Sequence, residues 1–345
     1  MNVYPEKIAN KEALENLLSI PTEAAVKMFS ALEGDIMFLG IGGKIGPSLA
    51  KMAKRACEQA GVQKRIYGVS LFESDEQRKQ IEAIGIETIH GDLLDTVFIG
   101  SLPKVRNVFF LAGMKFGSEE NISLTWAVNS YMPALVAEHF KGSRIVAFST
   151  GCVYPLVPIE SGGSLESDLP TPLGEYAQSC LGRERMFQYG SKKYQTDVCL
   201  IRLNYSVELR YGVLVDIATK VKKQEPIDLS MGYFNVIWQG DVNDVVLRSL
   251  GICESPAKIL NITGEKTLSV KEVALEFGKL FNVSPEFFNE EAKTALLNNS
   301  EQAFELFGRP KVSTQQIIKW IAAWIGEDKE TLGKPTHYEV RDGKY

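Results

Sequence analysis

A cluster of glycines between two predicted elements is the first stretch whose residue types could do chemistry. Residues 36–46, IMFLGIGGKIG, combine a short apolar run with three glycines at a spacing of three. Glycine adopts positive φ freely and has no Cβ to hold a ligand away. A helix predicted directly afterwards would point its free N–H groups and positive dipole end at the loop, which favours an anion. The stretch predicts a site for a dinucleotide pyrophosphate, and the alternative is a plain strand-to-helix turn. The residues predicted to form this site are Gly40, Gly43, Lys44, Ile45 and Gly46.

Composition places the chain among ordinary globular proteins. Its 345 residues, 45% hydrophobic and 23% charged, suffice for one large α/β domain or two smaller ones. The net charge is −5 and no basic block is present, which argues against a nucleic-acid partner. No apolar run approaches the roughly 20 residues that a membrane helix needs, so no membrane partner is predicted.

Cysteine and histidine usage bears on compartment and metal binding. The five cysteines are scattered without a CxxC pair, which favours reduced thiols over a disulfide framework or a zinc ribbon. The first residues lack the apolar segment of a signal peptide. We therefore expect a cytoplasmic protein. The three histidines lie far apart in the sequence, so no metal site is predicted.

Strands and helices are predicted to alternate after the glycine loop. Such alternation predicts an α/β fold with a Rossmann-like, doubly wound parallel sheet. The apolar run at 105–113 is typical of a strand covered on both faces. The predicted strands cover residues 65–70, 86–90, 105–113, 144–150 and 198–204, and the predicted helices cover 47–60, 75–84, 121–140 and 176–190.

The pattern changes at both ends of this region. Residues 1–33 predict an N-terminal extension of two short amphipathic helices. Residues 34–205, with interleaved later segments, are predicted to form the nucleotide-binding domain, and 206–345 mainly a smaller substrate-binding lobe. In that lobe we expect helices at 213–223, 269–281 and 313–325 and strands near 234–238 and at 258–263. The long loop at 151–175 directly follows a predicted strand, a position that is usually functional or mobile.

Five stretches occur in a fixed order along the chain: the glycine loop, Gly91-Asp92-Leu93, Phe110-Leu111-Ala112-Gly113, Ser149-Thr150 with Val153-Tyr154, and Tyr176-Ala-Gln-Ser-Cys180 with Glu184. Together, over about residues 35–325, they resemble the extended short-chain dehydrogenases/reductases of the NAD-dependent epimerase/dehydratase family. The resemblance implies NAD or NADP as cofactor. It also implies a homodimer that pairs two helices of each subunit, including the one that begins near Tyr176.

The resemblance also implies further cofactor contacts. Asp92, with Leu93, would lie at the adenine, while Ala112 and Gly113 would line the cofactor cleft. Asn129 matches a structural asparagine of the family.

Two more positions near the cofactor leave alternatives open. Lys115 matches a lysine that sugar-nucleotide 4-epimerases hold near the cofactor, and the alternative is a solvated loop lysine. Ser70 ends the second predicted strand, where an acidic residue would mark NAD and a basic one NADP. Because serine is uncharged, both cofactors remain open.

The family's reaction requires a tyrosine that moves a proton while a hydride moves to or from the nicotinamide. By resemblance, Tyr176 is this acid/base and Thr150 orients the substrate oxygen. A free tyrosine has a pKa near ~10, and the family lowers it with a lysine four residues on.

This chain departs from that pattern at the lysine. Cys180 stands in its place, and a thiol is usually neutral near pH 7. Arg183, at i+7 from Tyr176, lies on roughly the same helix face and could supply the missing charge; the alternative is a surface arginine. Cys180 itself could be a nucleophile or a small buried thiol.

A second departure narrows the reaction. Family dehydratases have an Asp-Glu pair directly after the catalytic threonine, where this chain has Gly151 and Cys152. Neither residue can do that acid–base work, which disfavours 4,6-dehydration. Alcohol oxidation, ketone reduction and epimerisation remain.

The substrate is expected over the carboxyl edge of the sheet. Trp238 could stack on a sugar ring or belong to the core. No convincing basic cluster for a nucleotide diphosphate is present, which favours a polyol, free sugar or sugar acid over a nucleotide sugar. The polar C-terminal tail could cover the site or an interface, or pack loosely. The predicted substrate-binding residues are Cys152, Asn204, Tyr211, Trp238 and Gln239.

The sequence therefore predicts an NAD(P)-dependent oxidoreductase or epimerase acting on a secondary hydroxyl of a carbohydrate-like substrate. The rival hypothesis is a protein that kept the cofactor site and lost turnover with the lysine, and that acts as a regulator or redox sensor. Retention of Tyr176 and Thr150 favours the enzyme, and Cys180 favours the rival.

Overall fold

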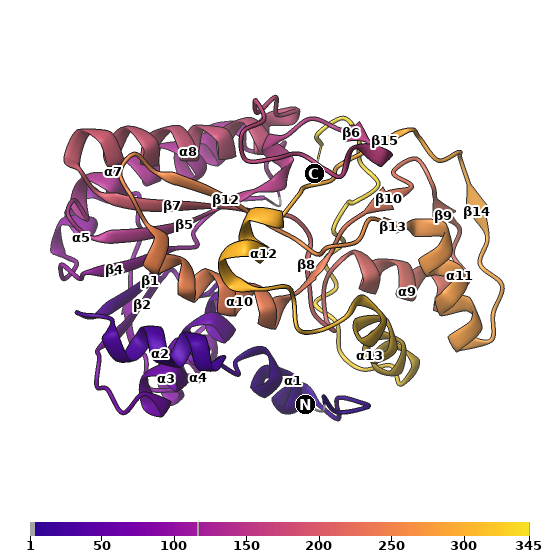
Figure 1. Cartoon of the computed structure of the whole chain (residues 1–345), viewed down its shortest axis with the longest axis horizontal. Coiled ribbons are helices and arrows are strands. Elements are labelled where there is room, and N and C mark those ends of the chain that lie inside the picture. The colour runs from indigo at the N-terminus through magenta and orange to yellow at the C-terminus, as the bar shows by residue number, and fades with distance from the viewer. Residues whose placement is uncertain (1–3, 116, 345) are drawn as a thin grey trace.

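The computed structural model describes residues 4–115 and 117–344. Its centre is a seven-stranded parallel sheet (Figure 1). The order reverses between β1 and β4, and in such sheets ligands bind at the carboxyl ends of the strands near the reversal. In spatial order the strands are β12 (Lys258–Ile262), β7 (Asp197–Leu203), β5 (Arg144–Thr150), β4 (Asn107–Phe110), β1 (Ile36–Leu39), β2 (Ile66–Ser70) and β3 (Glu87–His90). The predicted Rossmann-like doubly wound sheet is confirmed.

Helices cover both faces of this sheet (Figure 1). All four residues of β1 and of β4 are buried, as expected for strands covered on both faces. One face packs against α2 (Glu23–Ala31), α3 (Gly46–Gln59), α4 (Asp75–Ala83), α10 (Gln239–Arg248) and α12 (Glu301–Phe307). The other packs against α5 (Thr96–Ser101), α7 (Met132–His139) and α8 (Gly174–Tyr194).

The helix predicted over 121–140 is divided into three parts. They are α6 (Ile122–Trp126), a π-helical segment η1 (Ala127–Tyr131) and α7. Pro133 has no N–H, so it cannot make the α-helical bond to the carbonyl of Asn129, four residues earlier. Wider turns of this kind often accompany functional sites, and this one contains Asn129.

A second lobe is built from α1 (Lys11–Leu18), α9 (Val213–Lys223), α11 (Val270–Phe281) and α13 (Thr314–Gly326) (Figure 1). Its core includes Trp238 and Trp320, whose ring centroids lie 5.2 Å apart. Short strands pair around this lobe: β6 (Val157–Pro158) with β15 (Thr294–Ala295), β8 (Ser206–Val207) with β11 (Ile237–Trp238), β9 (Ile227–Asp228) with β14 (Phe287–Phe288), and β10 (Tyr233–Phe234) with β13 (Leu268–Ser269). Single 3₁₀ turns are η2 (Gly151–Val153), η3 (Ile159–Ser161) and η4 (Ser249–Ile252).

The two short helices predicted before residue 33 are α1 and α2. The side chains of Asn10 and Thr22 cap them by accepting hydrogen bonds from the backbone N–H groups of Ala13 and Ala25. Across residues 4–115 and 117–344, none of the helices is long and apolar enough to cross a membrane.

Candidate active site

The glycine loop joins β1 to α3 at the carboxyl edge of the sheet. Gly40 has φ +87°, and a Cβ there would lie 2.6 Å from the backbone N of Ala112. A Cβ on Gly46 would lie only 2.0 Å from the carbonyl oxygen of Ile41. Ile45 precedes α3 without a side-chain cap, so the first N–H groups of this helix are left for another acceptor. The backbone thus forms a tight cradle suited to an anion.

The outer end of the predicted cofactor groove follows the neighbouring strands. Ser70 ends β2 beside the loop, since a Cβ on Gly42 would lie 2.7 Å from its Oγ. Asp92 follows β3, and its Oδ1 accepts a hydrogen bond from the N of Leu94 at 2.8 Å. Leu93 packs its side chain into the core. Ala112 and Gly113 follow β4 at the same edge.

A pocket of about 310 Å³ lies between the glycine loop, the end of β5, the start of α8 and the second lobe. Thr150 enters it from the end of β5 and Tyr176 from the first turn of α8. These two side chains lie close enough for the Thr150 hydroxyl to lower the pKa of the Tyr176 phenol. The other residues that line the pocket are Gly40, Gly43, Lys44, Ile45, Gly46, Leu111, Lys115, Phe148, Ser149, Cys152, Leu203, Asn204, Tyr205, Ser206, Tyr211, Gly212 and Thr336.

The surroundings of Tyr176 keep its phenol protonated. Burial raises its pKa well above the usual value, and the nearby thiols of Cys180 and Cys152 act in the same direction. The Arg183 charge and the neighbouring Thr150 hydroxyl oppose the rise. Cys180 is fully buried and packs against Tyr176, and burial raises its thiol pKa to about 11. It is therefore a small neutral thiol rather than an activated nucleophile.

Arg183 is not a surface residue, so that alternative is wrong. Its side chain is only 6% exposed and donates to the Phe148 carbonyl at 2.9 Å and to Oδ1 of Asn129 at 2.6 Å. A Cβ on Gly113 would lie 2.5 Å from its Nη2. The guanidinium therefore lies behind the wall of the pocket, where its charge lowers the pKa of both Tyr176 and Cys180 without lining the cavity.

Asn129 has a positioning role in the structure. It is completely buried, and its amide bonds both the N and the carbonyl of Met114, at 2.9 and 2.8 Å. It also donates to Oγ of Ser179 at 3.0 Å. Asn129 thus ties the loop after β4 to helix α8 and does not line the pocket.

Both candidate lysines reach the pocket. Lys115 donates to the carbonyl of Thr336 at 3.0 Å, and burial lowers its pKa, so it is not a solvated loop lysine. Lys44 extends from the glycine loop over the ring of Tyr211, with Nζ 4.1 Å from the ring centroid.

Of the predicted substrate residues, Cys152, Asn204 and Tyr211 line the pocket, whereas Trp238 and Gln239 do not. Trp238 is 2% exposed and packs in the core of the second lobe. Gln239 is the first residue of α10, and its side chain donates to Oγ of Ser48 on α3 at 3.0 Å. The expectation of a Trp238–Gln239 wall is corrected, because these residues join the lobe to the sheet instead.

Tyr205 and Thr336 also line the pocket, although neither was among the predicted site residues. Tyr205 follows the predicted Asn204 and has φ +44°, a positive value that no sequence signal indicated. Thr336 comes from the C-terminal tail, whose covering role was one of the stated alternatives. Long-range packing brings both residues into the pocket, so spacing alone could not identify them.

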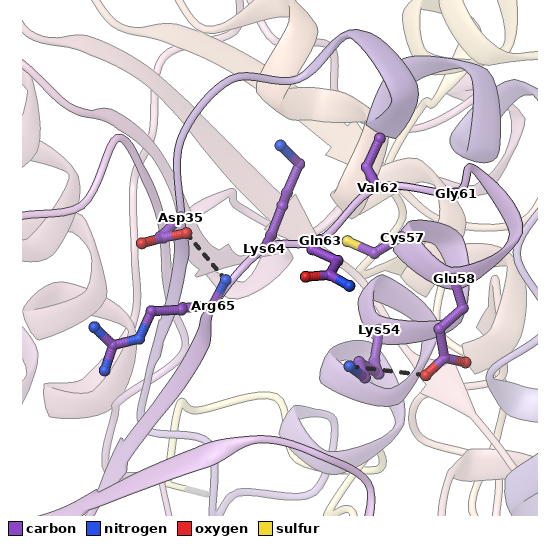
Figure 2. Close-up of a pocket in the computed structure, with 9 residues that line it drawn as sticks. All are labelled: Asp35, Lys54, Cys57, Glu58, Gly61, Val62, Gln63, Lys64 and Arg65. Carbon is purple, nitrogen blue, oxygen red and sulfur yellow. Dashed lines mark hydrogen bonds and ion pairs between the residues drawn. The ribbon is translucent and has the colours of Figure 1, made fainter.

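A larger hollow, of about 720 Å³, lies at the opposite edge of the sheet (Figure 2). Asp35 and Arg65, which precede β1 and β2, border it, and the Asp35 carboxylate accepts a hydrogen bond from the Arg65 backbone N at 3.0 Å. Burial raises the pKa of the Cys57 thiol in this hollow to about 11, so the thiol is unreactive. Parallel sheets bind ligands at the other edge, and we do not assign this hollow to the active site.

No protein-family model matches the sequence, and neither does any curated protein. Among solved structures, MoeE5 in complex with UDP-glucose and NAD superposes with a TM-score of 0.69 at 18% identity, over 85% of this chain and 99% of that one. UDP-glucose 4-epimerase of Thermus thermophilus, in complex with NAD, gives 0.68 at 20% identity over the same shares. DesIV, a dTDP-glucose 4,6-dehydratase from Streptomyces venezuelae with NAD and TYD bound, gives 0.71 at 16% identity over 85% and 97%.

This chain therefore has the fold of the NAD-dependent epimerases and dehydratases. The similarity extends over nearly the whole length of each of these structures. The resemblance found in the sequence motifs is confirmed at the level of the fold.

Proposed function

We propose that this protein is an NAD(P)-dependent oxidoreductase or epimerase acting on a secondary hydroxyl, or the corresponding ketone, of a carbohydrate-like substrate. The observation that carries the proposal is that Thr150 and Tyr176 meet in one pocket that the glycine loop also lines. The solved structures with this fold support it, because they include a UDP-glucose 4-epimerase, a dTDP-glucose 4,6-dehydratase and a complex with UDP-glucose, each with NAD bound.

The glycine loop fits a dinucleotide. Gly40 and Gly46 leave no room for side chains, and a Cβ on Gly43 would come no closer than 3.5 Å to its nearest neighbour, the Gly40 carbonyl. Together with the uncapped start of α3, they would hold the pyrophosphate. Bound there, the nicotinamide would supply hydride chemistry. Ser70 favours neither NAD nor NADP, although NAD is the cofactor named for the solved structures with this fold.

The remaining chemistry belongs to this chain's own residues. Thr150 would orient the substrate oxygen, and Tyr176 would hold or release the proton on it. Because the Tyr176 phenol stays protonated at neutral pH, it is suited to donating a proton to a ketone oxygen. We therefore expect ketone reduction to be faster than alcohol oxidation near pH 7.

The variant Tyr176→Phe tests the proposal. Loss of the phenolic proton should reduce turnover by about 10² to 10⁴-fold, while cofactor affinity, measured by calorimetry, stays within twofold of wild type. Tyr194→Phe, at the far end of the same helix, is the matched control and should keep full turnover.

Two outcomes would contradict the hypothesis that this protein is an enzyme with Tyr176 as its acid/base. If Tyr176→Phe turns over substrate as fast as wild type, Tyr176 is not the acid/base. If the wild-type protein binds cofactor but reduces, oxidises and epimerises no sugar, sugar acid, polyol or nucleotide sugar, the regulator hypothesis replaces the enzyme hypothesis. Cys180 in the lysine position is the feature that favours that second candidate.

We also propose a homodimer formed through α6, η1 and α8. The segments α6 and η1 pack against α8, and large apolar side chains are exposed on them. Exposed clusters of this kind often mark protein interfaces. The exposed residues are Leu124, Trp126, Tyr131 and Tyr189.

A further inference from the structure

Two lysine side chains enter the active-site pocket from different loops. Lys44 comes from the glycine loop and Lys115 from the loop after β4, and both line the pocket. Their charges are close enough to interact, because the charge of Lys115 contributes to lowering the pKa of Lys44. Two ammonium groups facing one small cavity raise the local positive potential and attract an anion.

The Lys44 amine points to the substrate side of the pocket. Its Nζ lies over the Tyr211 ring and donates to the carbonyl of Ser206 at 3.4 Å. Both partners belong to the segment that begins with β8 and leads to α9, across the pocket from the glycine loop. The amine is therefore directed at the second lobe, whereas the pyrophosphate cradle is made of backbone N–H groups at the start of α3.

Burial lowers the pKa of Lys44 to about 8, so the Lys44 amine is mostly protonated and positively charged at pH 7. The two carboxylates that face it, Glu208 and Asp216, are already hydrogen-bonded to other residues. Glu208 accepts hydrogen bonds from the N of Arg210 at 3.0 Å and from its Nε at 3.2 Å. Asp216 accepts from the N and Oγ1 of Thr336, at 2.8 and 2.6 Å. Among the described residues, no carboxylate forms an ion pair with Lys44.

The C-terminal segment, residues 331–344, closes the substrate side. Leu332 donates its N–H to the Arg210 carbonyl at 3.0 Å, and Thr336 lines the pocket. A Cβ on Gly343 would lie 2.4 Å from the carbonyl of Leu173, so the segment ends tightly against the start of α8. Figure 1 shows this segment, in yellow, running from α13 towards the C-terminus near β6. The pocket of about 310 Å³ must receive the reactive end of the cofactor and the substrate together.

We propose that the substrate is a small carbohydrate-like molecule bearing an acidic group, a carboxylate or a phosphate monoester, which Lys44 and Lys115 bind. The proposal rests on the proposed function and specifies the substrate class of the same site. Tyr211 supports it by holding the Lys44 amine against its ring while the anion is bound.

The test is calorimetric titration of the whole chain in the presence of saturating NADH or NADPH, whichever binds, so that the pyrophosphate cradle is occupied. The probes are D-glucuronate, glucose 6-phosphate, neutral D-glucose and UDP-glucose. We expect one of the two acidic sugars to bind at least about tenfold more tightly than glucose and UDP-glucose, which corresponds to one charge-assisted contact. The preferred acidic sugar distinguishes carboxylate from phosphate.

Substitutions of the two lysines test whether they cause the preference for the acidic sugar. Lys44→Gln and Lys115→Gln should each lower the affinity for the acidic sugar about tenfold and leave the affinity for glucose unchanged. Lys44→Arg should keep the preference for the acidic sugar over glucose. Lys54→Gln, on α3 at the opposite edge of the sheet, is the matched control. Three results would overturn the proposal. They are acidic sugars that bind no better than glucose, UDP-glucose that binds more tightly than every other probe, and a preference for the acidic probe that both glutamine variants retain. Failure of both NADH and NADPH to bind would instead refute the proposed function.

The pH dependence gives a second readout. The groups that face the Lys44 amine are Glu208, Arg210, Lys115, Asp216 and Tyr211. Burial raises the pKa of Tyr211 to about 12, so its phenol stays neutral over this range. Because Lys44 loses its charge as the pH rises through about 8, affinity for the acidic probe should fall above that pH in wild type. In Lys44→Arg the guanidinium stays charged, so the fall should become smaller, and only the part due to Lys115 should remain. A wild-type profile that is flat between pH 7 and 9.5 would contradict the role of Lys44.

Discussion

At the scale of residues, the proposed catalytic pair, Thr150 and Tyr176, lies in front of a buried ion pair. Glu184 on α8 accepts hydrogen bonds from Nε and Nη2 of Arg202 on β7, at 3.0 and 2.7 Å, and from Oγ of Ser149 at 2.6 Å. Arg202 also donates to the hydroxyl of Tyr154 at 2.6 Å. Since Ser149 directly precedes Thr150, this network joins the strand that carries Thr150 to the helix that carries Tyr176.

The variant Glu184→Gln should therefore lower both stability and turnover. Breaking a buried, hydrogen-bonded ion pair from one side typically costs about 3–5 kcal/mol, because the partner charge stays buried. We expect a loss of that size in the free energy of unfolding measured in urea. Glu138→Gln, an exposed position on α7, should change it by no more than about 0.5 kcal/mol. If the two variants were equally stable, the network would not hold the site together.

Motif spacing could indicate individual residues but not their surroundings. Thr150 and Tyr176 were predicted from their match to a family pattern, and they meet in one pocket. The position of Arg183 could not be settled, because spacing gives a helix face but not what covers that face. Its burial depends on Asn129 and on the close approach of Gly113, which belong to other elements.

At the scale of elements, the periodic segments were predicted well. The strand expected at 144–150 and the helix expected at 213–223 have those bounds in the structure. The helix expected at 121–140 is interrupted at η1, although Pro133 in its sequence was a visible signal. In place of the single strand expected near 234–238, the structure has two separate two-residue strands, β10 and β11. The sequence alone could not indicate such short strands, because pairing between distant segments defines them.

The exposed faces of these elements lead to a prediction about assembly. If α6, η1 and α8 form the dimer interface, wild type should sediment as a dimer at micromolar concentration. Tyr131→Glu places a charge on the exposed face of η1 and should yield monomers, because burying an unpaired charge is costly. Lys79→Glu, on exposed α4, should remain dimeric. A wild-type monomer would refute the proposed dimer.

At the scale of the whole molecule, the order of strands and helices was sufficient to predict the sheet but not the walls of the pocket. Right-handed crossovers and apolar strands leave few topologies for such a pattern. The substrate side instead combines Asn204, Tyr211 and Thr336 with the glycine loop. Trp238 illustrates why the pocket walls could not be predicted. From sequence alone, a tryptophan near a strand end is equally compatible with stacking on a sugar ring and with burial in the core.

The central claim is that the glycine loop binds a nicotinamide dinucleotide that serves the Thr150–Tyr176 pair. The most direct measurement is calorimetric titration of the purified protein with NAD⁺, NADH, NADP⁺ and NADPH. We predict that one oxidised and reduced pair binds, and that Gly46→Ala abolishes this binding because its Cβ would lie 2.0 Å from the Ile41 carbonyl oxygen. Gly100→Ala, with no atom within 4 Å of the added Cβ, should bind like wild type. Absence of binding by all four dinucleotides would contradict the account.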